Sequence, residues 1–223
     1  MNYNYLLNQL NEVEKKNAPK ELFFKGDFNL LTEGRRVSVV GSRKVSKNGL
    51  KRTAIISELL VKHGITVVSG LALGVDTKAH QTAIEKGGKT IAVLGNSLSN
   101  VYPKENKSLQ DKIKKDHLVI SQFKEGIPTT PKNFPMRNRT MALISDATII
   151  IEASEKSGTK HQGWEALRLG RNLYILENLI TEVNISWVNE MIEYGAQVLT
   201  KSNVDEHFQS IPYLTSKLEE VEI

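Results

Sequence analysis

Residues 132–139 read KNFPMRNR, and they gather basic, amide and aromatic side chains in one short stretch. Pro135 suits the first turn of a helix, so Arg137 and Arg139 should lie close to the N-terminus of a helix. Cations at that end oppose the helix macrodipole at a cost of about a few tenths of a kcal/mol each. A bound phosphate offsets this cost. The stretch therefore predicts a helix N-terminus that faces an anionic ligand.

The side chains of this stretch should not all have the same role. Arg137 and Arg139 are roughly 200° apart around a helix, so we expect one to reach outward and the other to brace a loop or a neighbouring strand. Phe134 has two interpretations, a hydrophobic staple at the start of the helix or a platform on which a base stacks beside a basic groove. Lys132 and Asn138 complete this group of candidate binding residues.

A second candidate anion site is the VVGSR stretch, in which Gly41, Ser42 and Arg43 follow an apolar run. Glycine lets the backbone approach a phosphate, and an arginine can hold a phosphate with two parallel hydrogen bonds. The alternative is a tight turn before a solvated basic helix face, because several cations up to Arg52 precede the first acid, Glu58. No Gly-Lys-Ser/Thr follows, so the stretch is not a Walker A loop.

Two further stretches also follow apolar runs. In SGLALGVD, Gly70 and Gly74 bracket an apolar turn that is typical of either a packing turn or a ligand loop, and its spacing differs from the dinucleotide fingerprint. In EASEKSG, Glu152 ends an apolar run, and Ser157 and Gly158 precede a predicted helix, as in a helix cap or an anion contact. No Ser-His-Asp set, paired carboxylates or metal-binding cluster stands out. We therefore expect no catalytic residues, no metal and no cofactor.

The elements that position these stretches alternate along the chain. Apolar runs predict strands at 36–42, 65–70, 89–95, 117–121, 146–153 and 172–176. Helices are predicted at 46–64, 76–88, 106–116, 134–145, 161–170 and 185–195. Strands that are apolar on both faces and alternate with helices predict a doubly wound, mainly parallel α/β sheet with an extended Rossmann-like architecture. Ligands of such sheets bind outside the carboxyl ends of the strands, where all four stretches lie.

The two ends of the chain and its composition indicate the domain organisation and the localisation. We expect a short amphipathic helix at 1–17, a core at 18–200 that opens with a lead-in strand, and a tail at 201–223. A net charge of +5 favours polyanions mildly, and the absence of cysteine excludes disulfides and thiolate metal sites. The sequence contains neither a signal peptide nor an apolar run of membrane-spanning length. We therefore expect a cytoplasmic protein that does not bind membranes.

Taken in order, VSVVGSR, VVSGLALGVDTKAH, TIAVLG with YPKEN, FPMRNR and EASEKSG resemble the core of the bacterial DNA-processing protein family DprA, also called Smf. The resemblance covers about residues 18–200. It implies an extended Rossmann-like fold, a homodimer and binding of single-stranded DNA without sequence preference. It also implies the loading of a RecA-type recombinase, including onto DNA coated by single-strand binding protein, in natural transformation or recombination. The family is not known as an enzyme.

The resemblance further implies that the candidate residues form one DNA-binding pocket. Its phosphate-facing turn would be Gly41, Ser42 and Arg43, and its floor Gly70 and Gly74. Its rim would be Phe134, Arg137, Asn138 and Arg139, with Lys132 nearby, and its far side Glu152, Ser157 and Gly158.

Departures from the family pattern leave an alternative class open. The stretch TKHQGWEALRLG replaces the usual small-residue helix start, and residues 1–17 and 201–223 match neither the helical N-terminal domain nor the winged-helix domain of many members. The alternatives are a nucleotide-binding sensor and a nucleotide phosphoribohydrolase of the lysine-decarboxylase-like group. Only Gly158 and Thr159 match the phosphate loop of those enzymes.

Overall fold

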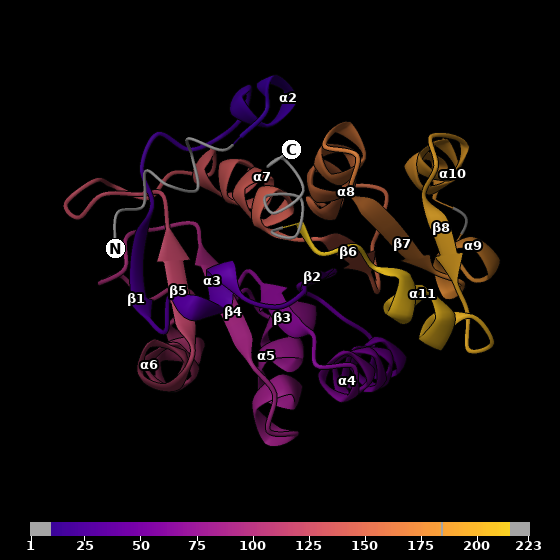
Figure 1. The fold of residues 1–223 in the computed structure, drawn as a ribbon, viewed down its shortest axis with the longest axis horizontal. Coiled ribbons are helices and arrows are strands. Elements are labelled where there is room, and N and C mark those ends of the chain that lie inside the picture. Colours follow the sequence, from indigo (N-terminus) through magenta and orange to yellow (C-terminus); the bar gives the residue numbers. More distant parts are fainter. Residues whose placement is uncertain (1–9, 184, 215–223) are drawn as a thin grey trace, which may run out of the picture.

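The computed structural model describes residues 10–183 and 185–214, which form a mainly parallel sheet between layers of helices (Figure 1). Over these residues the sheet has eight strands in the order β1-β5-β4-β3-β2-β6-β7-β8. Their bounds are β1 Phe23–Gly26, β2 Arg36–Val40, β3 Thr66–Ser69, β4 Thr90–Leu94, β5 Leu118–Ser121, β6 Ala147–Ile150, β7 Asn172–Leu176 and β8 Gln197–Leu199. Strand β1 pairs antiparallel with β5, and the other pairs are parallel. The predicted doubly wound, mainly parallel α/β fold is confirmed.

The strand order reverses between β2 and β6. From β2 the chain adds β3, β4 and β5 on one side, and later adds β6, β7 and β8 on the other. The parallel register of β2 and β6 sets Val40 opposite Ile150, so both strands end at the same edge of the sheet. The helix that follows β2 and the helix that follows β6 lie on opposite faces of the sheet. The crevice between these two connections is where such folds bind ligands.

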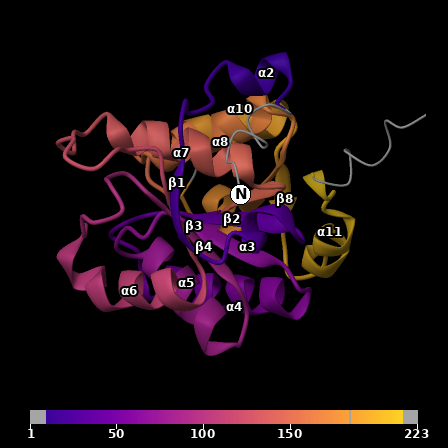
Figure 2. The ribbon, with the colours of Figure 1, turned by 60° about the vertical axis from the view of Figure 1, so that its left-hand side comes forward.

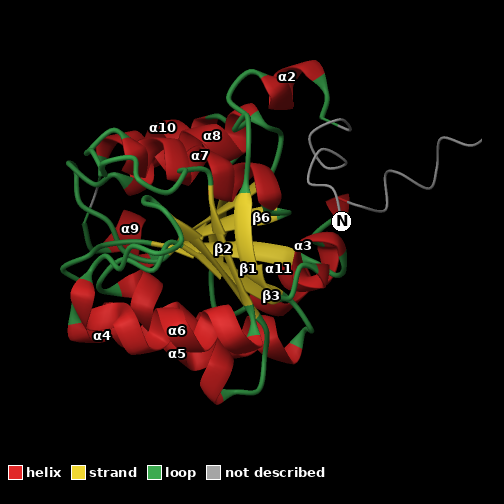
Figure 3. Ribbon diagram, turned by 90° about the vertical axis from the view of Figure 1, so that its left-hand side faces the viewer, coloured by secondary structure: helices red, strands yellow, loops and turns green. Residues whose placement is uncertain are grey.

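Two layers of helices cover the sheet, as Figures 2 and 3 show. One layer consists of α4 Lys47–Lys62, α5 Val75–Glu85 and α6 Lys107–Asp116. The other consists of α7 Asn133–Ile144, α8 Thr159–Arg168 and α10 Ser186–Glu193. Shorter elements are α2 Glu12–Lys15, α3 Asn29–Thr32, α9 Asn178–Thr181, α11 Val204–Ser210 and the 3-10 turn Lys104–Asn106. None of the helices within 10–183 and 185–214 is long and apolar enough to cross a membrane.

Helix α4 illustrates how local sequence sets these elements. The Ser46 hydroxyl caps its N-terminus by accepting a hydrogen bond from the Gly49 N–H at 2.9 Å. Thr53, Ile56 and Leu60 are spaced by three or four residues, and all are buried on one face. The cap and the apolar face together place the start of α4 directly after the loop that follows β2.

The ends of the chain differ in part from the expectations. Helix α3, which follows the lead-in strand and buries Leu30 and Leu31, was not predicted. Helices α9 and α11 were not predicted. In α11, Phe208 is fully buried in the same hydrophobic cluster as Leu60 of α4, so core packing continues beyond residue 200. Most of the helix predicted at 1–17 and the end of the tail lie outside the described residues, in 1–9 and 215–223.

A buried histidine in α5 gives the fold a predicted pH dependence. Nδ1 of His80 lies 2.7 Å from Oγ1 of Thr90, and burial is the main cause that lowers the pKa of His80 to about 3. In the unfolded chain a histidine titrates near pH 6.5, so between about pH 6.5 and 3 only the unfolded state carries this proton. The free energy of unfolding should therefore fall by about 2 kcal/mol between pH 7 and pH 5.

Urea denaturation at the two pH values measures this difference. The His80→Gln variant is the control, because it cannot take up the proton in either state. If the parent and His80→Gln lose the same stability on acidification, His80 is not the source of the pH dependence.

Candidate functional site

A cavity of about 410 Å³ lies at the switch point between β2 and β6. Four segments line it: the loop after β2, the loop leading into α5, the first turns of α7, and the loop after β6 with the start of α8. The four polar stretches singled out in the sequence thus meet at one edge of the sheet. They contribute Gly41, Ser42 and Arg43, then Asp76, then Phe134, Arg137 and Asn138, and finally Ser157 and Gly158.

The loop after β2 is fixed by close backbone contacts. The Ser42 N–H donates to the carbonyl of Glu152 at 2.8 Å, and the Ser42 carbonyl accepts from the Val75 N–H at 3.2 Å. A side chain at Gly74 would overlap the Ser42 carbonyl, and one at Gly41 would overlap the Glu152 carbonyl. Gly74 also has a φ of +81°, which favours glycine. Gly74 therefore shapes the turn from outside the cavity instead of forming its floor.

Arg43 and Phe134 form one unit at the mouth of the cavity. The exposed Arg43 guanidinium lies over the Phe134 ring, with its central carbon 5.1 Å from the ring centroid. This is a cation–π contact. The half-buried Phe134 ring also lies against Gly95, and its centroid is 5.6 Å from that of Tyr102. These contacts join separate loops, so they favour the platform interpretation of Phe134 over the hydrophobic staple.

Arg137, expected at the rim, is instead buried, with 4% of its surface exposed. Its Nη1 lies 3.7 Å from Oδ2 of Asp76 and donates to the Val93 carbonyl at 3.3 Å. Gly70 makes room for this guanidinium, because a side chain there would overlap it. Burial raises the pKa of Asp76 against the opposing effect of Arg137, and burial lowers the pKa of Arg137. The Asp76 carboxylate therefore offsets the positive charge of Arg137. This partner was not predicted from the sequence.

The loop after β6 closes the cavity from the α8 side. The Asn138 side chain donates to the Gly158 carbonyl at 3.2 Å, which ties α7 to the start of α8. The Ser157 hydroxyl accepts from the Thr159 N–H at 3.2 Å. Lys156 also lines the cavity and is exposed. Lys156 was not predicted as a site residue, because a single loop lysine follows no periodic pattern.

Five of the expected site residues do not line this cavity: Gly70, Gly74, Lys132, Arg139 and Glu152. Lys132 and Arg139 are exposed elsewhere on α7 and its cap, so the two arginines have the separate roles that their helical spacing indicated. The Glu152 carboxylate instead accepts hydrogen bonds from the N–H and the hydroxyl of Ser46, at 2.8 and 2.6 Å. Glu152 thus braces the cap of α4, and Gly70 lines a smaller neighbouring cleft.

The cavity carries a marked excess of positive charge. Its lining includes one carboxylate, Asp76, and four cationic side chains, Arg43, Lys44, Arg137 and Lys156. The N-termini of α7 and α8 also contribute to the lining, which adds the partial positive charge of two helix dipoles. Among the described residues no group of His, Cys, Asp and Glu side chains fits a metal ion. The chemistry of the site is that of anion binding next to an aromatic ring.

Comparison with known proteins finds a matching family model and relatives that cover most of this chain. The family model for DNA recombination-mediator protein A matches residues 2–211. DNA processing protein DprA of Streptococcus pneumoniae is 40% identical over 183 residues, which are 82% of this chain and 64% of that protein. DprA of Bacillus subtilis is 30% identical over 194 residues, 87% of this chain and 65% of that protein. The chain thus spans just under two thirds of the length of these two relatives.

A solved structure supports the same assignment. DprA of Helicobacter pylori, reported for its single-stranded DNA binding mode, superposes with a TM-score of 0.77 at 30% identity. The match covers 91% of this chain and 92% of the other. The fold and the cavity define a Rossmann-like protein with a cationic site at its switch point. The chain belongs to the DNA recombination-mediator protein A family, whose curated members are named DprA or Smf, and the resemblance seen in the motifs is confirmed.

Proposed function

We propose that the cavity at the switch point binds single-stranded DNA through its phosphates, without requiring a particular sequence. The observation that carries this proposal is the pairing of an exposed guanidinium, Arg43, with the Phe134 ring at the mouth of a cationic cavity. Cations that follow the backbone, together with aromatic rings on which bases stack, are the usual means of binding single strands. Phosphates would lie against Arg43, Lys44 and Lys156, and a base against Phe134.

We also propose the finer role that family membership supports. In this role the chain loads a RecA-type recombinase onto bound DNA in the cytoplasm, acts as a homodimer and works on strands coated by single-strand binding protein. The support is the match to a family described as a recombination mediator. An assay of RecA filament formation on coated single strands tests this part separately from DNA binding.

Salt dependence tests the phosphate-binding part of the proposal. Binding of a labelled oligo-dT, followed by fluorescence anisotropy, should weaken steeply as salt increases. Each neutralised phosphate contributes about −0.7 to the log–log slope, so contacts by Arg43, Lys44 and Lys156 give a slope of about −2. A flat salt dependence would contradict binding through phosphates.

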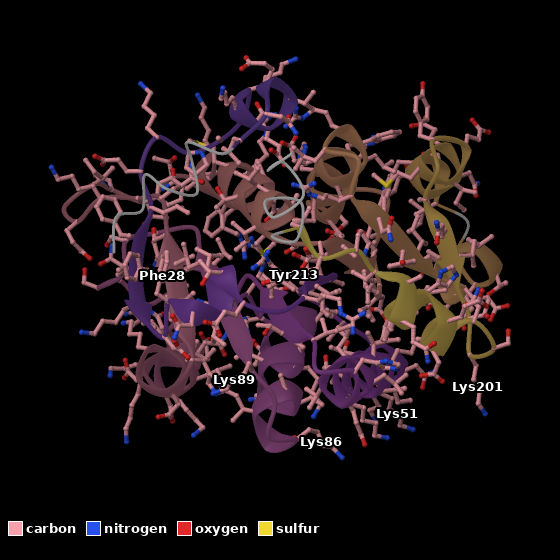
Figure 4. The ribbon with its side chains drawn as sticks, in the orientation of Figure 1. Phe28, Lys51, Lys86, Lys89, Lys201 and Tyr213 are labelled. Atoms are coloured by element: carbon pink, nitrogen blue, oxygen red, sulfur yellow. The ribbon has the colours of Figure 1, made fainter. Side chains whose placement is uncertain are left out.

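The control is Lys89→Ala, which removes one positive charge at the other edge of the sheet. Lys89 immediately precedes β4, at the amino end of that strand, and it is labelled in Figure 4. This variant should keep both the affinity and the slope of the parent. The nucleotide alternatives predict a different pattern, in which a nucleoside monophosphate binds or is hydrolysed and oligo-dT does not bind.

A further inference from the structure

The turn that follows β3 contains a strained leucine. Among residues 10–183 and 185–214, Leu71 is the one non-glycine residue with a positive φ, +58°. This left-handed conformation is unfavourable for a residue with a side chain, because its Cβ lies too close to the following carbonyl oxygen. Leu71 is also fully buried, in a hydrophobic cluster that contains Leu94 and Ile113. Such a conformation persists only where the surrounding structure enforces it, so contacts around this turn must hold it.

Asn106 holds this turn from another segment of the chain. It ends the YPKEN stretch, and its side chain is buried, with 4% of the residue exposed. Its Nδ2 donates to the Leu71 carbonyl at 2.9 Å and to the Thr77 hydroxyl at 2.8 Å. The Thr77 hydroxyl in turn donates to the Ala72 carbonyl at 2.7 Å. The amide of Asn106 therefore fixes two consecutive carbonyls of the turn, one directly and one through Thr77.

The residues after this turn support the loop that carries Arg43. The Val75 N–H donates to the Ser42 carbonyl at 3.2 Å. Gly74 packs so closely that a Cβ there would lie 2.3 Å from the Ser42 carbonyl oxygen and 2.8 Å from that of Arg43. The left-handed residue Leu71 sets the direction in which the chain enters these contacts. A relaxed Leu71 would turn the chain elsewhere and withdraw this support from the Arg43 loop.

We propose that Asn106 is a positioning residue for the DNA site. Asn106 itself does not line the cavity. It enforces the left-handed conformation of Leu71, and the residues that follow Leu71 then place Arg43 where it meets a phosphate. This inference rests on the proposed binding of single-stranded DNA, and it extends the machinery of that site to a buried amide behind it.

The Asn106→Ala variant should weaken binding of oligo-dT roughly tenfold, the lower end of the loss expected for one charge-assisted phosphate contact. Its distinctive effect is on the salt dependence. The log–log slope should fall in magnitude by about 0.7, because the Arg43 phosphate contact is lost although the substitution removes no charge. Anisotropy titrations at several salt concentrations measure both quantities, at a temperature where thermal melting shows the variant to be folded.

A double-mutant cycle with Arg43→Ala identifies the route of the effect. If Asn106 acts through Arg43, Asn106→Ala should cause no further loss of affinity in the Arg43→Ala background. Asn203→Ala is the matched control. The Asn203 amide also donates to a backbone carbonyl, that of Val198 at 3.0 Å, but it does so in the loop after β8. This control should keep the parental affinity and slope, whatever stability it loses.

The results of these titrations separate this inference from the proposed function. A smaller slope together with non-additive losses supports the role of Asn106. Parental binding by Asn106→Ala, a loss of affinity without a change of slope, or a loss that adds in full to that of Arg43→Ala overturns it and leaves single-stranded DNA binding intact. If Asn106→Ala does not fold, Thr77→Val replaces it and removes the link to Ala72. Failure of the parent protein to bind oligo-dT overturns the proposed function as well.

Discussion

The Asp76→Ala variant should lose about 3–5 kcal/mol of unfolding free energy, which is the usual cost of leaving one partner of a buried ion pair without the other. Arg137 is nearly inaccessible, and Asp76 Oδ2 lies 3.7 Å from its Nη1. Among the described residues, removal of the carboxylate leaves the buried guanidinium with one backbone acceptor, the Val93 carbonyl. Urea denaturation followed by circular dichroism measures the loss.

A double variant tests the cause of this loss. Replacing Arg137 with methionine in the Asp76→Ala background removes the unpaired charge and keeps much of the side-chain volume. It should recover at least half of the lost stability, because an apolar replacement of a buried ion pair is often nearly neutral. If Asp76→Ala is as stable as the parent, the pair does not hold α7 against the first turn of α5.

The Arg43→Ala variant should weaken binding of oligo-dT roughly ten- to hundredfold, the range expected for loss of charge-assisted hydrogen bonds of about 1.5–3 kcal/mol. The salt slope should fall in magnitude by about 0.7, because one phosphate contact is lost. Arg43→Lys should restore most of the slope and only part of the affinity, since lysine cannot hold a phosphate with two parallel bonds. Anisotropy titrations at several salt concentrations give both quantities.

Phe134→Leu distinguishes stacking from charge. It removes the aromatic face but no charge, so it should lower the affinity by about 1–3 kcal/mol, the contribution of one stacked base, and leave the salt slope unchanged. Because Arg43 rests on Phe134, the two substitutions should not be additive, and a double-mutant cycle measures their coupling. Parental binding by Arg43→Ala would remove the loop after β2 from the proposed phosphate site.

The repeating part of the fold followed from the sequence because buried parallel strands are apolar on both faces. The runs RVSVV and ATII become β2 and β6, and both are fully buried. The short helices α3 and α9 have four residues each, too few for a helical period to stand out. Helix α11 is recognisable only through the burial of Phe208, whose ring lies against His63 at the C-terminal end of α4, a contact between distant segments.

The site was predictable in location and only partly in its residues. The loops after β2 and β6 were predicted to lie together, because ligands of such sheets bind outside the carboxyl ends of the strands. Arg137 and Arg139 were predicted to have different roles, because they point to different sides of a helix. Residue type could not reveal that Arg137 pairs with Asp76, because that contact depends on how α7 packs across β4.

The stacking of Arg43 on Phe134 has a consequence for the entropy of binding. A long surface side chain normally loses rotamer freedom when a ligand immobilises it, at a cost of about 0.5–1.5 kcal/mol. Here the guanidinium already rests on an aromatic ring that is itself held by Gly95 and Tyr102. Much of that freedom is therefore lost during folding, before any ligand arrives. In the proposed site, an incoming phosphate would therefore meet a preorganised receptor, and more of the electrostatic attraction would be retained as affinity.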